Sequence, residues 1–165
     1  MEAWEVWVRS TSLSRFVLAH ELWVWPILEM LHYCGLSLLF GTVGLFDLRV
    51  LGFIKRIPAG ALHRLIPFGI AGYVLNLLTG LAFLSAHPEQ YVYNSAFHWK
   101  LAFMSLAAIN VVAFYMAAFR ELRQLPAQSE APRRTRVLTG ISLVCWVAVL
   151  TCGRLLTFYR PPFFH

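Results

Sequence analysis

Long runs of apolar residues fill most of this chain, and short segments rich in Pro, Gly, Arg and His separate them. A helix needs about 20 mostly apolar residues to cross roughly 30 Å of hydrocarbon. Four runs reach that length, at residues 25–46, 65–86, 97–119 and 137–157. The pattern predicts an all-α integral membrane protein, a four-helix bundle whose outer surface meets the lipid bilayer.

Composition agrees with this fold class. The mean hydropathy is +0.62 and 13% of the residues are charged, whereas a soluble domain carries about a quarter charged residues. We expect one compact domain at residues 25–159, preceded by an N-terminal segment, 1–24, and followed by a tail, 160–165. Residues 124–132, which contain two prolines, form the predicted flexible linker.

The N-terminal segment mixes apolar and charged side chains. It lacks the basic start and continuous apolar core of a cleaved signal peptide, so we expect it to remain attached. Trp4, Trp7 and Phe16 alternate with Arg9 and Arg15, a pattern typical of an amphipathic helix lying at the lipid surface. A frayed terminus is the alternative.

Basic residues between the predicted helices fall in the first and third connecting segments. The first contains Arg49, Lys55, Arg56 and Arg64, and the third contains Arg120, Arg123, Arg133, Arg134 and Arg136, whereas residues 87–96 contain none. Because short basic loops are retained in the cytoplasm, both termini are predicted to face the periplasm or the outside. The net charge of +6 is then a topology signal, and no nucleic-acid surface is expected.

Polar residues inside the apolar runs are the candidates for a site, because they are costly in hydrocarbon and normally face the bundle interior. Glu29 and His32 share one helix face, and a carboxylate beside an imidazole can orient a metal-bound or haem-bound histidine. A structural pair, or a glutamate reaching the interface, is the alternative. Asn76 is a candidate hydrogen-bond donor to a ligand or a helix, and Gly69 and Gly72 allow a helix or a flat macrocycle to approach closely.

The third helix opens with two candidate ligands, His98 and Lys100, which lie about 200° apart around the helix and cannot both face one central site. Lys100 either turns inward as a ligand or proton donor or extends to water, and His98 is expected at the interface. Arg154, near the end of the fourth helix, is positioned to pair with Glu29 or a haem propionate, or to extend to water.

Glu29, His32, Lys100 and Arg154 all fall toward the same, outer side in the predicted topology, so one shared site accounts for them together. Counting about 1.5 Å per residue from the inner helix ends places His32 roughly 22 Å, Lys100 roughly 30 Å and His98 roughly 33 Å above the inner boundary. Since the lysine stem can reach back toward the centre, Lys100 meets His32 better than His98 does. An inner boundary of the first helix near Lys55 would instead raise His32 by about 12 Å and weaken this preference.

Other polar and sulfur residues are predicted to have structural roles. At the inner end of the first helix, Asp47 and Arg49 are expected to anchor the inner loops through partners on other helices, with a proton route as the alternative. Cys34, Cys145 and Cys152 lack the spacing of a zinc site. We interpret them as small packing residues.

Several strings resemble those of an uncharacterised family of small four-span bacterial inner-membrane proteins. They are Trp25-Pro26 with Glu29, Leu31-His32 and Gly35, then Phe46-Asp47-Leu48-Arg49-Val50-Leu51-Gly52, Thr79-Gly80, Ala96-Phe97-His98-Trp99-Lys100-Leu101 and Gly153-Arg154. More distantly, a His in the first span with a Lys opening the third resembles the HemJ-type protoporphyrinogen oxidases and the CopD-like copper-resistance proteins. The HemJ-type resemblance implies that His32 and Lys100 hold the iron of a b-type haem.

Three classes of function follow. The first is a haem b redox or electron-transfer protein, an oxidoreductase or its subunit, acting between a quinone or porphyrin and a partner membrane or periplasmic redox subunit. The second is a non-catalytic small subunit of a larger respiratory or other membrane complex. A transporter is disfavoured, because four spans without inverted repeats leave little room for alternating access.

Overall fold

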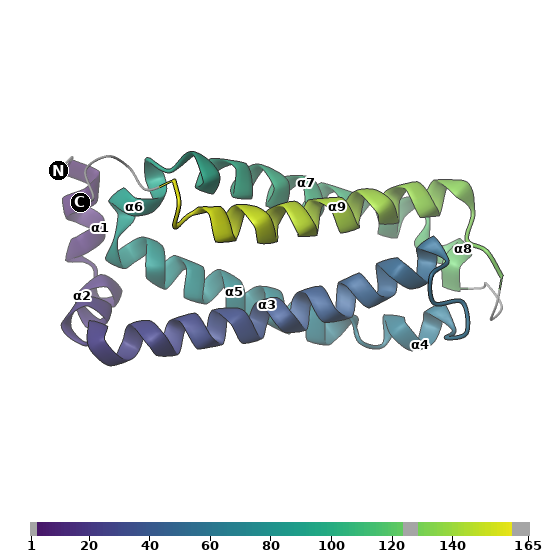
Figure 1. Cartoon of the computed structure of the whole chain (residues 1–165), viewed down its shortest axis with the longest axis horizontal. Coiled ribbons are helices and arrows are strands. Elements are labelled where there is room, and N and C mark those ends of the chain that lie inside the picture. Colours follow the sequence, from purple (N-terminus) through teal and green to yellow (C-terminus); the bar gives the residue numbers. More distant parts are fainter. Residues whose placement is uncertain (1–2, 124–128, 160–165) are drawn as a thin grey trace.

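A computed structural model describes residues 3–123 and 129–159, and within these ranges the regular structure is entirely helical. The predicted tail, 160–165, and part of the predicted linker, 124–128, lie outside the described residues. Four helices are long and apolar enough to cross a membrane. They are α3 (Glu21–Leu51), α5 (Ile66–Ala86), α7 (Ser95–Ala117) and α9 (Arg133–Leu155). The predicted all-α membrane bundle is confirmed, and Figure 1 shows the four helices side by side along its length.

Short helices cover the two ends of this bundle (Figure 1). At one end lie α1 (Ala3–Ser10), α2 (Ser12–Ala19) and α6 (Pro88–Val92), and we call it the capped end. At the other end lie α4 (Ala59–His63) and α8 (Phe119–Arg123), together with the two Arg-rich connecting segments. We call it the basic end.

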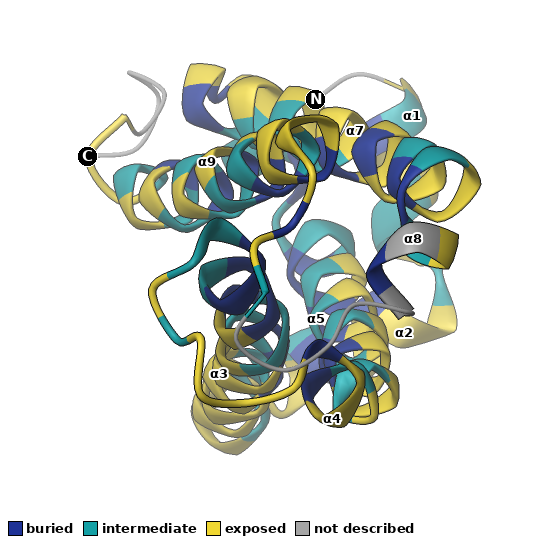
Figure 2. Ribbon diagram, turned by 90° about the vertical axis from the view of Figure 1, so that its right-hand side faces the viewer, coloured by how far each residue is buried: buried dark blue, intermediate teal, exposed yellow. Residues whose placement is uncertain are grey.

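The long helices associate as two hairpins, α3 with α5 and α7 with α9, and α3 also contacts α9 (Figure 2). In the first hairpin the backbones approach so closely that glycine is required. A Cβ atom at Gly72 would lie 2.5 Å from the Gly35 carbonyl oxygen and 2.8 Å from the Leu39 nitrogen, and one at Gly69 would lie 2.5 Å from Thr42 Oγ1. The glycines of α5 therefore admit a neighbouring helix, which was one of the two predicted roles.

Two asparagines hold the second hairpin together. Asn94 precedes α7, where its Oδ1 accepts a hydrogen bond from Ala96 N at 3.0 Å, and its Nδ2 donates to the Leu156 carbonyl at 3.0 Å. Asn110 Nδ2 donates to the Leu138 carbonyl, also at 3.0 Å. Because a polar group in an apolar interior is costly without a partner, these amides fix the register of α7 against α9.

The two hairpins meet most closely near the basic end. Phe46 of α3 and Phe114 of α7 form an edge-to-face pair with ring centres 5.7 Å apart, and buried residues of α4 and α8 complete the cluster. Large apolar side chains cover the outer surface instead, among them Ile70, Leu78, Ile109, Val112, Met116 and Val144. This distribution is typical of helices that face lipid.

The N-terminal segment is two helices rather than the single amphipathic helix predicted, and it is ordered rather than frayed from residue 3. Thr11 separates them because its hydroxyl accepts a hydrogen bond from Ser14 N at 3.3 Å and caps α2. Val17 of α2 is buried against Ala82 and Ala86 of α5. The segment thus packs on the capped end of the bundle.

Candidate functional site

His32 lies on α3 in the half of the bundle nearer the capped end and faces α5. Its Nδ1 is 2.7 Å from Thr79 Oγ1, and the Thr79 hydroxyl is 2.8 Å from the Leu75 carbonyl oxygen. Because that hydroxyl has one hydrogen and donates it to the carbonyl, His32 Nδ1–H donates to Thr79. The imidazole is held in the tautomer whose Nε2 carries the lone pair, the form that a metal ligand needs.

Asn76 lies next to His32 but acts on the backbone. Its Nδ2 donates to the His32 carbonyl oxygen at 3.1 Å and approaches the Gly72 carbonyl at 3.4 Å. The amide therefore ties α5 to α3 at the turn that positions the imidazole. Of the two roles predicted for Asn76, the structure shows the bond to a helix.

Lys100 lies half-buried on α7 and is directed toward α9. A Cβ atom at Gly153 would be 3.9 Å from the Lys100 Nζ, and the ammonium group is within electrostatic range of His32 and Cys152. On the opposite hairpin, a Cβ atom at Gly80 would be 3.9 Å from His32 Cε1. Each of the four long helices thus contributes one residue to the same region. These residues are His32 of α3, Gly80 of α5, Lys100 of α7 and Gly153 of α9.

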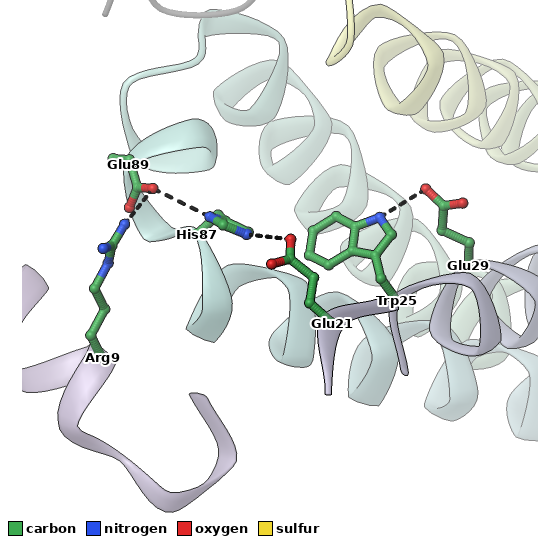
Figure 3. Close-up of polar contacts among 6 residues, drawn as sticks. All are labelled: Arg9, Glu21, Trp25, Glu29, His87 and Glu89. Atoms are coloured by element: carbon green, nitrogen blue, oxygen red, sulfur yellow. Dashed lines mark hydrogen bonds and ion pairs between the residues drawn. The ribbon is translucent and has the colours of Figure 1, made fainter. Parts of the chain in front are cut away.

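Glu29 does not orient His32, because Thr79 occupies the imidazole Nδ1. Glu29 is exposed, and its Oε1 accepts a hydrogen bond from Trp25 Nε1 at 3.1 Å (Figure 3). The Glu29 charge instead affects Tyr91 of α6. Burial of the Tyr91 side chain and the nearby Glu29 carboxylate raise the pKa of the Tyr91 hydroxyl to about 12. Of the three interpretations of Glu29, the structure favours a side chain that reaches the bundle surface.

The remaining predicted site residues lie at the surface of the capped end. Arg154 is exposed, and its guanidinium carbon lies 5.6 Å from the centre of the Phe158 ring, a cation–π contact. His98 is exposed beside Trp99, which is 63% exposed. The structure therefore brings His32 and Lys100 into one region and leaves Glu29, His98 and Arg154 exposed at the surface.

A polar network joins the capping helices to the bundle, and sequence reasoning missed it. Arg9 of α1 pairs with Glu89 of α6 at 2.6 Å, and His87 Nδ1 lies 3.5 Å from the same carboxylate oxygen (Figure 3). His87 Nε2 lies 3.3 Å from Glu21 Oε1 at the start of α3. The available signal was charge complementarity, since residues 87–96 contain an acid and no Lys or Arg, whereas the N-terminal segment contains Arg9.

The charges around Glu89 decide its ionisation. Partial burial alone would raise the pKa of this carboxyl, but hydrogen bonds from its own backbone and from Arg9, with the charges of Arg9 and His87, hold the pKa below its usual value. The ionised form is therefore the one that the folded network stabilises.

Asp47 and Arg49, near the basic end, have different partners. Arg49 is buried, and its Nε donates to the Ile57 carbonyl, so it anchors the first connecting loop as predicted. Asp47 is only 4% exposed and lies near Ser142 of α9. Its Oδ2 has no hydrogen-bond partner, and the side chain lines a cavity of about 310 Å³ between the two hairpins.

Among the described residues, no cluster of three or more His, Cys, Asp or Glu side chains could hold a metal ion. The cysteines are unpaired, with Cys145 and Cys152 buried, as expected of packing residues, and Cys34 exposed. Comparison of the chain with protein-family models, curated proteins and solved structures found no significant match.

Proposed function

We propose that the half of the bundle near the capped end binds a b-type haem through His32 and Lys100, and that the protein passes electrons at the periplasmic face of a bacterial inner membrane. The observation that carries this proposal is the His32–Thr79 hydrogen bond of 2.7 Å. Because Nδ1 donates this hydrogen bond, the imidazole Nε2 is the nitrogen left to bind a metal, as in many metal-bound histidines.

The surrounding residues have separate tasks in this proposal. His32 and Lys100 supply one nitrogen each from opposite hairpins, and Asn76 fixes the α3 backbone that bears His32. Arg154, exposed at the same end, offers a cation for a propionate group. A bound haem would supply one-electron chemistry, and a quinone or porphyrin is the proposed electron donor.

The proposed orientation rests on charge. Both Arg-rich segments lie at the basic end, and residues 87–96 of the capped end contain no Lys or Arg. Because basic loops are retained in the cytoplasm, the capped end and both termini would face the periplasm. The haem region would then be accessible to a periplasmic or membrane-bound redox partner.

An absorbance spectrum of the detergent-purified protein from haem-replete cells tests this function. We expect a Soret band and, on reduction, the split visible bands of a low-spin b-type haem. Colourless protein that gains no such spectrum on addition of haem would contradict the proposal.

The second candidate is a non-catalytic subunit of a larger membrane complex, and the N-terminal helices favour it. Trp7 is 70% exposed, Phe16 56% and Leu13 48%, although α1 and α2 pack firmly on the bundle. Exposed aromatic residues are enriched at protein interfaces as well as at membrane surfaces. Colourless protein that copurifies with a stoichiometric membrane partner, and loses it when Trp7 and Phe16 are replaced by Ser, would support this alternative.

A further inference from the structure

We propose that the cavity at Asp47 binds a lipophilic organic ammonium ion from the membrane, with the cationic nitrogen paired to the Asp47 carboxylate. This site is independent of the proposed haem region, since Asp47 follows His32 by fifteen residues on α3, about 22 Å along the helix.

The carboxyl group is the first argument. Asp47 is 4% exposed, its Oδ2 has no hydrogen-bond partner, and the Ser142 hydroxyl lines the same cavity. Arg49, two residues away, directs its Nε to the Ile57 carbonyl instead. Because an ionised carboxylate in an apolar interior is costly without a counter-charge, a bound cation would stabilise this side chain.

The walls of the cavity are the second argument. The described residues that line it include no Lys or Arg, and the one histidine among them, His63, has its Nε2 3.2 Å from the Tyr115 hydroxyl. Aromatic rings line it instead, including Tyr73 with Trp146, whose centres are 6.3 Å apart, and Phe46 with Phe114. A carboxylate among aromatic rings is the arrangement that recognises organic ammonium groups, because ring faces attract cations.

Size and access select the class of cation. A cavity of about 310 Å³ is far larger than a bare metal ion needs, since a water molecule occupies about 30 Å³ of liquid. Two of its lining residues, Ile70 of α5 and Val111 of α7, are 59% and 40% exposed on the outer surface of the bundle. The cavity therefore borders the face that meets lipid, and an amine with an apolar body would reach it from the bilayer.

Two matched probes test the proposal on the full chain in lipid nanodiscs, with empty nanodiscs as the partition blank. Benzyltrimethylammonium carries the positive charge, and neopentylbenzene has the same shape without it. We expect saturable binding of the cation that Asp47→Asn weakens by more than about tenfold. Glu130→Gln, which removes an exposed acid at the same end, should leave the affinity unchanged. No saturable binding, equal binding by Asp47→Asn, or neopentylbenzene binding as tightly as the cation would overturn the proposal.

A measurement on the unsubstituted protein keeps the test independent of variant folding. Dicyclohexylcarbodiimide modifies carboxyl groups in apolar surroundings, and mass spectrometry locates the adduct. Benzyltrimethylammonium should slow labelling at Asp47, and neopentylbenzene should not. Labelling at Asp47 that the cation leaves unchanged would contradict the proposed pairing.

Discussion

Gly72 shows how one residue controls the spacing of the first hairpin. Its missing Cβ leaves room for the backbone of α3, with the Gly35 carbonyl oxygen 2.5 Å and the Leu39 nitrogen 2.8 Å from where that atom would lie. Backbone atoms cannot rotate away as side chains can, so Gly72→Ala must separate α3 from α5. We expect a loss of about 1–3 kcal/mol in the free energy of unfolding, measured by thermal or denaturant unfolding in detergent.

Gly41→Ala is the matched control for this prediction. A Cβ atom at Gly41 would meet nothing within 4 Å, and Ala favours a helix over Gly by about 1 kcal/mol. The control should be neutral or slightly stabilising. Equal destabilisation by both substitutions would show that close packing at Gly72 is not the cause.

The sequence predicts which polar residues lie inside the bundle, but it does not predict their hydrogen-bond partners. His32 and Asn76 are inside the bundle because polar groups are costly in lipid, and that argument needs the sequence alone. The partner of His32 could not be foreseen, since Thr79 lies 47 residues away and resembles any other small residue of α5. Asp47 was interpreted as a loop anchor, but only the packing of α3 against α9 and α5 reveals the cavity beside it.

At the scale of elements, the ion pair between Arg9 and Glu89 should fasten α1 to the bundle more firmly at neutral pH than in acid. Glu89 has its pKa held below the ordinary value of 4.5, so its stabilising effect is complete above that pH and is lost as the pH falls through the lowered pKa. We expect Glu89→Gln to cost about 0.5–1 kcal/mol at pH 7.

Unfolding temperatures measured from pH 7 to pH 3 check this prediction. The difference between the native protein and Glu89→Gln should shrink below pH 4.5, the ordinary pKa of the group. Glu130→Gln is the control, because Glu130 is 64% exposed and solvent screens its pair with Lys55. A difference that stays constant with pH would show that the Glu89 charge is not what holds the network.

The sequence predicts the ends of the helices more accurately than it predicts which helices pack together. The predicted spans 65–86 and 97–119 agree with α5 and α7 to within a few residues, since apolar length and flanking Pro and Asn set the helix ends. The first span is longer than predicted because α3 runs on to Gly52, whose φ of 99° ends it. Docking of α1 and α2 could not be predicted, because it depends on contacts 80 residues apart.

For the whole molecule, the orientation in the membrane decides which compartment the proposed haem region would face. Nine Lys and Arg residues lie at the basic end, four in or beside the first connecting segment and five in or beside the third. We expect a reporter fused after Arg123 to be active only in the cytoplasm, and one at Gln90 only in the periplasm. The reverse pattern would place the haem region on the cytoplasmic side.

The proposal that His32 and Lys100 together hold a haem can be tested by the visible spectra of single variants. His32→Ala and Lys100→Leu should each abolish or change the low-spin spectrum, because each would remove one of the two nitrogens proposed to hold the haem. His98→Ala should leave the spectrum nearly unchanged, since His98 is exposed at the surface. Circular dichroism would establish that all three variants fold. A spectrum lost in His98→Ala but retained in Lys100→Leu, or retained in His32→Ala, would contradict the account.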